Sequence, residues 1–192
     1  MLSRRPLLGA TLGATLGTAC LPGRAADAPN DAAEAALRRG GVVIAFRHAL
    51  APGTFDPPGF RLGDCSTQRN LNEDGRAQAR RIGAWFAARG LVPARVRSSP
   101  WCRCVDTAQL AFGAAEPWAA LGSPRGASET TNAESLEALR RAVAARREGI
   151  EVWVTHMFVL SALVGEGSAS GEGLVLASVD GVVALRARLA IP

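Results

Sequence analysis

The sequence of 192 residues has no lysine, no tyrosine and only two histidines, His48 and His156. All 22 basic side chains are therefore arginine. The absence of lysine excludes Schiff-base enzymes, a lysine general base and the Gly-Lys-Ser/Thr phosphate loop. Any imidazole chemistry must use one or both of the two histidines. The chain is 48% hydrophobic, which is enough for one domain with a proper core and a tight fit for two.

Residues 1–25 are predicted to be a cleaved export signal. The Arg4-Arg5 pair precedes a mildly apolar stretch, as in twin-arginine signals, and the stretch is too short and glycine-rich for a stable membrane span. Cleavage after Gly23-Arg24-Ala25 would release a periplasmic or secreted chain that starts near residue 26. Lipoprotein anchoring through Cys20 and a disordered or weakly helical tail are the alternatives.

Removal of the signal lowers the formal net charge from +5 to +2, because residues 1–25 contain three arginines and no acid. The remaining arginines form no run of the kind that a nucleic-acid-binding arm needs. We therefore expect no nucleic-acid partner and no membrane span. The sequence makes no prediction of the oligomeric state.

Export would place Cys65, Cys102 and Cys104 in an oxidising compartment. Three cysteines predict one disulfide and one buried thiol, with Cys65 paired to Cys102 or to Cys104. Zinc is the alternative, but a Cys-x-Cys pair with one distant cysteine is poor ligand spacing. Arg103, between the pair, would also repel a cation. We therefore expect no metal and no cofactor.

The order of the predicted elements indicates the α/β class. Strands are expected over 42–46, 95–98 and 151–155, helices over 31–39, 72–90, 99–112, from 131 onward and over 157–164, and two closing strands over 173–191 around Asp180-Gly181. Continuous apolar strands that alternate with helices are typical of a buried parallel sheet. We predict a single three-layer domain over residues 26–192, with a mostly parallel sheet and helices on both faces. The long loop over 49–71 is expected to be functional or disordered.

Three of these helices begin at capping signals. Asn72 is expected to cap the second helix, Ser99-Pro100 to form an N-cap and first-turn pair, and Thr131 to Glu134 to form a capping box. The inner face of the second helix is expected to carry Gly75, Ala79, Ile82 and Phe86.

Both histidines directly follow an apolar strand, and ligands of open α/β sheets bind outside the carboxyl ends of the strands. If the strands are neighbours, Arg47, His48, Arg103 and His156 converge at one edge of the sheet. Guanidinium groups, imidazoles and helix N–H groups suit a phosphoryl dianion and repel metals. An imidazole there can attack phosphorus while the arginines stabilise the oxygens. Thr155 is a further candidate for phosphate binding.

Four motifs resemble the histidine phosphatase superfamily, which has the phosphoglycerate-mutase-like fold. They are Arg47-His48-Ala49, Leu71-Asn72-Glu73-Asp74-Gly75 with Gln78-Ala79, Ser98-Ser99-Pro100 with Arg103 and Thr107-Ala108, and Thr155-His156. The resemblance implies that His48 is the phosphorylated nucleophile and that Arg47, Arg103 and His156 complete a metal-free phosphate pocket. The chain also resembles exported members of the family that act on lipopolysaccharide core heptose phosphates. This resemblance implies an envelope phosphosugar as the substrate.

The chain departs from the family pattern at the general acid. In the mutase-like branch a glutamate follows a Trp-x-Leu-like segment, whereas Gly122-Ser123 follows that segment here. The acid-phosphatase branch has an aspartate after the second histidine, where this chain has Met157. Glu129, Asp56 and Asp64 are the candidate acids, unless the leaving group needs little help.

These observations predict an exported, metal-independent phosphatase of the histidine acid type, which hydrolyses a small phosphomonoester through phospho-His48. A mutase fits less well, because the short segment over 113–130 leaves little room for a lid. The first alternative is a non-catalytic phosphoryl- or sulfate-binding protein of the same fold. The second is a metal-dependent hydrolase that uses the two histidines and carboxylates.

Overall fold

The computed structural model describes residues 28–123 and 129–192. The predicted export signal, with Cys20, lies outside the described residues. The elements in chain order are α1 (Ala28–Arg39), β1 (Val42–Arg47), η1 (Cys65–Thr67), α2 (Glu73–Ala88), β2 (Arg95–Ser98), α3 (Cys102–Phe112), β3 (Glu116–Pro117), η2 (Ala119–Leu121), α4 (Glu129–Ala145), β4 (Ile150–Thr155), α5 (Met157–Val164), β5 (Gly173–Val179) and β6 (Val182–Leu189). None of the described helices is long and apolar enough to cross a membrane.

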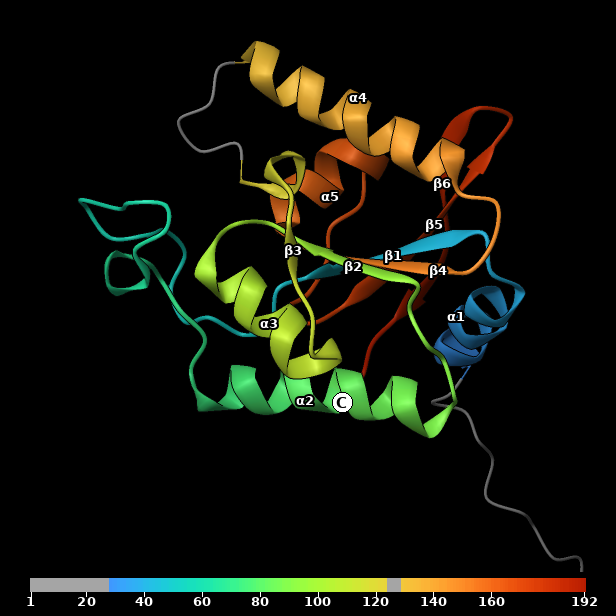
Figure 1. Cartoon of the computed structure of the whole chain (residues 1–192), viewed down its shortest axis with the longest axis horizontal. Helices are drawn as coiled ribbons and strands as arrows, with labels where there is room; N and C mark the ends of the chain where they lie inside the picture. Colours follow the sequence, from blue (N-terminus) through green and yellow to red (C-terminus); the bar gives the residue numbers. More distant parts are fainter. Residues whose placement is uncertain (1–27, 124–128) are drawn as a thin grey trace, which may run out of the picture.

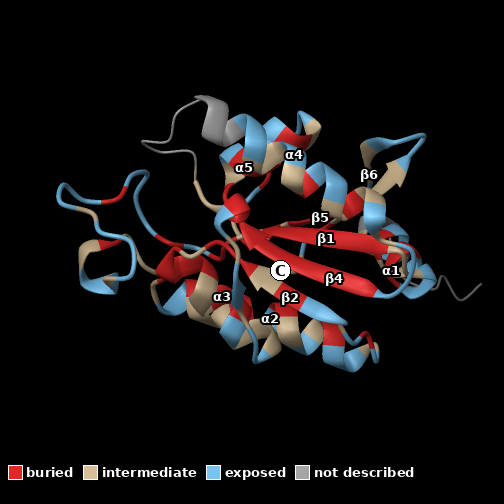
Figure 2. Ribbon diagram, turned by 45° about the horizontal axis from the view of Figure 1, so that its top comes forward, coloured by how far each residue is buried: buried red, intermediate tan, exposed pale blue. Residues whose placement is uncertain are grey.

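The strands form one six-stranded sheet in the order β3-β2-β4-β1-β5-β6. The first four of these strands are parallel, and β5 and β6 are added antiparallel. Arg47 pairs with Thr155 and Ser98 with Val154, so β1, β4 and β2 end at the same edge of the sheet. The two central strands, β1 and β4, are buried almost throughout, as Figure 2 shows, because helices cover both of their faces.

Helices cover the sheet on both sides, which confirms the predicted three-layer α/β domain (Figure 1). On one side, α1, α2 and α3 contribute apolar residues such as Leu37, Ile82 and Ala108 to a first core. On the other side, α4 and α5 contribute residues such as Leu139 and Leu160 to a second core. The cores are therefore separated by the sheet, whose carboxyl edge remains open for a site.

The prediction for α2 is confirmed in its cap and in its buried face. The Asn72 side chain accepts a hydrogen bond from the Gly75 backbone N–H at 2.9 Å. The buried residues of the helix are Gly75, Ala79, Ile82 and Phe86. A Cβ atom on Gly75 would lie 2.0 Å from the Leu50 carbonyl oxygen, so glycine is what allows the chain after His48 to pass close to this helix.

The predicted starts of the next two helices are wrong by two or three residues. The N-cap of α3 is Trp101 and the helix begins at Cys102, because the Ser99 backbone N–H still bonds the Val154 carbonyl at 2.8 Å and continues the sheet. α4 begins at Glu129, so Thr131 lies inside its first turn and does not cap it. The closing hairpin is confirmed: Asp180 and Gly181 both have positive φ, 51° and 82°, as a tight type I′ turn requires.

The long loop between β1 and α2 projects from the carboxyl edge of the sheet, where it is drawn in cyan in Figure 1. A disulfide joins Cys65 in this loop to Cys102 at the start of α3, and Cys104 is a buried free thiol. One of the two predicted pairings is therefore confirmed. The zinc alternative is wrong, because the disulfide uses two of the three cysteines that would have held the metal.

Candidate active site

The ends of β1 and β4 bring the two histidines together at the carboxyl edge of the sheet. The His48 backbone N–H donates to the Thr155 carbonyl at 2.9 Å, which extends the β1–β4 pairing by one residue. The centroids of the His48 and His156 rings are 5.6 Å apart, and both residues are buried. The two histidines were expected to lie close together if their strands were neighbours, and β1 and β4 are neighbours in the sheet.

The hydrogen bond of His48 assigns its tautomer. Its Nδ1 lies 2.8 Å from the Ala49 carbonyl oxygen. A carbonyl can only accept, so Nδ1 carries the proton and Nε2 keeps its lone pair. Burial lowers the pKa of His48 to about 3, and the nearby arginine charges of Arg103, Arg69 and Arg47 act in the same direction. The ring is therefore neutral and nucleophilic at Nε2 at any pH near neutrality.

His156 is held between Arg103 and Ser99. The Arg103 Nη2 lies 3.4 Å from the His156 Nδ1, which accepts because a guanidinium can only donate. The Nε2–H of the ring then points to the Ser99 hydroxyl at 2.8 Å, and the Cys104 sulfur lies 3.6 Å from the same nitrogen. Burial, and next the Arg103 charge, hold the pKa of His156 well below its ordinary value. The second imidazole is thus also neutral.

Arg47, Arg69 and Arg103 surround the two rings in one cavity. Among the described residues, the Nε atom of each of these three arginines is buried without a hydrogen-bond partner. Desolvation lowers the pKa of Arg47 and of Arg69, and the Arg103 charge adds to the effect at Arg69. Buried donors without acceptors are costly, and an anion with several oxygens would satisfy them.

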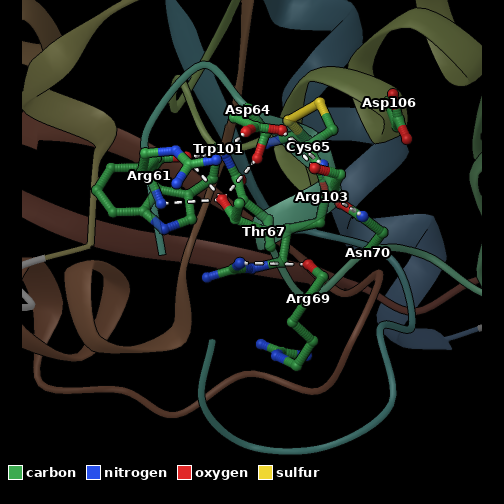
Figure 3. Close-up of a disulfide and its surroundings, with 12 residues drawn as sticks. Arg61, Asp64, Cys65, Thr67, Arg69, Asn70, Trp101, Arg103 and Asp106 are labelled. Atoms are coloured by element: carbon green, nitrogen blue, oxygen red, sulfur yellow. Dashed lines mark hydrogen bonds and ion pairs between the residues drawn. A yellow bond between two sulfur atoms is a disulfide. The ribbon is translucent and has the colours of Figure 1, made fainter. Parts of the chain in front are cut away.

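Sequence reasoning missed Arg69, because it lies in a loop without periodicity and in none of the quoted motifs. Its guanidinium is fastened by a short hydrogen bond from Nη1 to the Ala51 carbonyl. Its own carbonyl accepts from Arg103 Nη1 at 3.4 Å, an interaction that Figure 3 shows. The only signal in the sequence was its place close to Cys65, whose disulfide ties this part of the loop to α3.

Asp56 forms a buried ion pair with Arg103. Its Oδ1 lies 2.8 Å from Arg103 Nη1, and its Oδ2 lies 3.3 Å from Nη2. It also accepts from the Arg69 backbone N–H at 3.0 Å and from Trp101 Nε1 at 3.3 Å. Burial favours the protonated carboxyl, but the hydrogen bonds from Arg69 and Arg103 outweigh it and lower the pKa of Asp56. Asp56 is therefore a carboxylate that orients Arg103.

The cavity has a charged floor and a less polar outer part. Its volume is about 440 Å³. The floor is made by the two histidines, the three arginines and Asp56, and the outer lining is Gly53, Thr54, Phe55, Ser123, Met157 and Phe158. The outer residues come from the long loop, from the segment after η2 and from the start of α5. The cavity is larger than a phosphoryl group alone and lies within the ~300–1,000 Å³ common for small-molecule sites.

The other predicted site residues lie elsewhere. The Thr155 hydroxyl donates to the Leu121 carbonyl at 2.6 Å and is not part of the cavity lining. Asp64 caps η1 by accepting from the Ser66 backbone N–H at 3.1 Å, and it also lies outside the lining. Glu129 is the first residue of α4, and its side chain is not among those described. Cys104 is a buried thiol whose pKa burial raises to about 12, so it is not a thiolate nucleophile.

The disulfide fastens the loop that supplies Asp56 and Arg69 to the helix that supplies Arg103 (Figure 3). Two further contacts reinforce this attachment. The Cys102 backbone N–H donates to Gln68 Oε1 at 3.0 Å, and Phe60 stacks on Trp101 with centroids 5.5 Å apart. The loop is therefore a fixed wall of the cavity, although it has almost no regular secondary structure.

These features define a three-layer α/β protein with an anion site of arginines and neutral imidazoles at the carboxyl edge of its sheet. A family model of the histidine phosphatase superfamily (branch 1) matches residues 63–123, which include Arg69 and Arg103. The matched segment is therefore similar to the histidine phosphatase superfamily, and the fold of the chain is that of solved phosphatase structures. A comparison with curated protein sequences finds no match.

Several solved structures have the same fold. The protein histidine phosphatase SixA in complex with tungstate is 18% identical, with a TM-score of 0.52 over 78% of this chain and 96% of that one. A mycobacterial glucosyl-3-phosphoglycerate phosphatase in complex with VO3 is 16% identical, with a TM-score of 0.57 over 76% and 97%. A protein from Agrobacterium tumefaciens that is assigned as a phosphohistidine phosphatase is 27% identical, with a TM-score of 0.50 over 79% and 98%.

Proposed function

We propose that the protein is a phosphatase that hydrolyses a phosphomonoester through a phosphohistidine intermediate on His48. One observation carries the proposal: the Nδ1–H of His48 is fixed on the Ala49 carbonyl at 2.8 Å, which leaves a nucleophilic Nε2 inside an arginine-lined cavity. The phosphatase names of the structural neighbours and the tungstate and vanadate ions in two of their complexes support this reading.

The reaction takes two steps. In the first, the Nε2 lone pair of His48 forms a bond to phosphorus while the bond between phosphorus and the leaving oxygen breaks. In the second, water attacks phospho-His48, releases inorganic phosphate and restores the neutral ring. The positive charges of Arg47, Arg69 and Arg103 stabilise the equatorial oxygens of the phosphoryl group. The Nε–H groups of these arginines have no acceptor within the described protein, and the phosphoryl oxygens would supply one.

The leaving oxygen requires a proton or a low pKa of its own. Asp56 is the only carboxylic acid in the described lining of the cavity, and its lowered pKa makes it a poor acid in this arrangement. We propose that Asp56 acts on Arg103 and that the leaving group departs with little help or takes its proton from Glu129 on α4. We also propose that the enzyme works in the periplasm or outside the cell, which the Cys65–Cys102 disulfide supports.

The test is phosphate release from p-nitrophenyl phosphate and from a panel of phosphomonoesters by the purified protein. His48→Ala is expected to abolish turnover, and wild type quenched in alkali is expected to carry phosphate that is stable in base and released in acid. Leu62→Ala is a matched control on the loop, since Leu62 is exposed and outside the cavity lining. A folded protein that binds phosphate but hydrolyses nothing would instead be the non-catalytic binding protein. Loss of activity after EDTA dialysis would favour the metal-dependent alternative.

A further inference from the structure

The outer part of the cavity has two aromatic side chains that the fold leaves in water. Phe55, on the long loop, is 70% exposed, and Phe158, in the first turn of α5, is 52% exposed. They are the only aromatic residues among the exposed large hydrophobic side chains of the described chain, and both line the cavity. A single exposed apolar side chain is common on protein surfaces, but two exposed rings at the same charged cavity indicate a contact surface for a ligand.

Other aromatic rings of the described chain have aromatic partners within the fold. Phe46, Phe86 and Phe112 pack against one another, with centroids 5.2 to 6.2 Å apart. Phe60 stacks on Trp101 at 5.5 Å. Phe55 and Phe158 therefore differ from the aromatic side chains that pack inside the described fold, and both of them line the cavity.

The net charge of the cavity floor limits the charge that the leaving group of the substrate can carry. Three arginines face one carboxylate, and both histidines are neutral, so the described lining carries a net charge of +2. A phosphoryl dianion balances that charge completely. The outer lining next to it is formed by Thr54, Ser123, Met157 and the two phenylalanines, which carry no charge. An uncharged leaving group fits this wall better than one with a second acidic group.

We propose that the substrate is a phosphomonoester with an uncharged, ring-bearing apolar leaving group, which Phe55 and Phe158 contact. This inference rests on the proposed function, because it takes the floor of the cavity as the phosphoryl site. The class differs from the envelope phosphosugar that the family resemblance implies. Aromatic contacts of this kind add roughly 0.5–1.5 kcal/mol beyond area burial, which corresponds to about 2- to 10-fold in affinity.

The test uses non-hydrolysable phosphonates, so that its outcome does not depend on turnover. Calorimetry on the wild-type protein is expected to give about tenfold tighter binding of benzylphosphonate than of methylphosphonate, because the ring buries apolar area on the wall. Phe55→Ala and Phe158→Ala are each expected to reduce this ratio to about threefold, through weaker binding of benzylphosphonate. Both residues are exposed, so the folded state should persist, which circular dichroism checks.

Leu62→Ala is the matched control, because Leu62 lies on the same loop, is 52% exposed and is outside the cavity lining. It is expected to leave the ratio unchanged. Equal affinities for the two phosphonates, or a ratio that neither phenylalanine variant alters, would overturn the inference. Tighter binding of the non-hydrolysable phosphonate analogue of glucose 6-phosphate than of benzylphosphonate would overturn it in favour of a phosphosugar. If the phosphonate ratio holds but no ester is hydrolysed, the proposed function fails and the recognition of the ligand stands.

Discussion

Replacement of Asp56 by asparagine separates two roles that a carboxylate in this cavity can have. Asp56 holds Arg103 through contacts of 2.8 Å and 3.3 Å, and both residues are buried. The amide has the same shape but cannot neutralise the guanidinium. If Asp56 orients Arg103, the variant loses phosphoryl binding with every substrate. If Asp56 protonates the leaving group, the variant fails only with leaving groups of high pKa.

The structure sets the size of the expected loss. Hydrogen bonds between charged groups contribute about 1.5–3 kcal/mol each, so a misplaced Arg103 should lower kcat/KM by about 10- to 150-fold. The free energy of unfolding should also fall, by about 3–5 kcal/mol, because a buried charge loses its partner. The assay compares kcat/KM for p-nitrophenyl phosphate and ethyl phosphate, whose leaving groups differ widely in pKa. We expect a similar loss for both, together with weaker binding of inorganic phosphate.

Asp64→Asn is the matched control, since Asp64 accepts hydrogen bonds within the same loop but lies outside the cavity lining. It should leave both rates nearly unchanged. An Asp56→Asn variant that keeps its rate with p-nitrophenyl phosphate and loses about 100-fold or more with ethyl phosphate would refute the positioning role, because that selectivity is the mark of a general acid. Equal losses of kcat/KM in Asp56→Asn and Asp64→Asn would show that the loss comes from a disturbed fold of the loop.

Three further perturbations test the framework of the site. Cys65→Ser with Cys102→Ser, which opens a link across 37 residues, should lower the free energy of unfolding by about 4 kcal/mol in urea titrations, and dithiothreitol should then have no further effect. Gly75→Ala should lower that free energy by about 1–3 kcal/mol, because its Cβ meets the Leu50 carbonyl at 2.0 Å, whereas Gly167→Ala, with open space around it, should not. Finally, the pKa of His48 is about 3 in the fold and about 6.5 in the unfolded chain, so the unfolded state binds more protons in this window. Stability should therefore fall as pH falls from 6.5, with a contribution from His48 of up to about 1.4 kcal/mol per pH unit and a further contribution of the same sign from His156, whose pKa is also lowered. A constant stability between pH 7 and 5 would contradict the buried neutral rings.

The main elements of the fold were predictable because each follows from a local rule. Val42 to Phe46 is a continuous apolar run, and a strand buried on both faces is the element that accommodates such a run. The four-three-four spacing from Gly75 to Phe86 fixes the inner face of α2 in the same way. The convergence of His48 and His156 then needs only one non-local fact, which is that β1 and β4 are neighbours.

The long loop could not be predicted in this way. Asp56 and Arg69 are 13 residues apart, and no period or cap relates them, yet the Arg69 backbone N–H donates to the Asp56 carboxylate at 3.0 Å. Their place depends on the disulfide and on contacts with α3, which are tertiary interactions. Asp56 was a candidate acid in the sequence, and its ion pair with Arg103 is what gives it another role.

Ser99 shows why a correct local rule failed at the site. Serine followed by proline is a strong signal for a helix start, and the hydroxyl would then accept from the backbone of the first turn. Here the same hydroxyl lies 2.8 Å from His156 Nε2, and the backbone of Ser99 continues the sheet. The helix starts at Cys102, two residues after Pro100, and Arg103 in its first turn lies 3.4 Å from His156 Nδ1. The hydroxyl of Ser99 therefore contacts the second imidazole of the site and caps no helix, as expected where function and local preference compete.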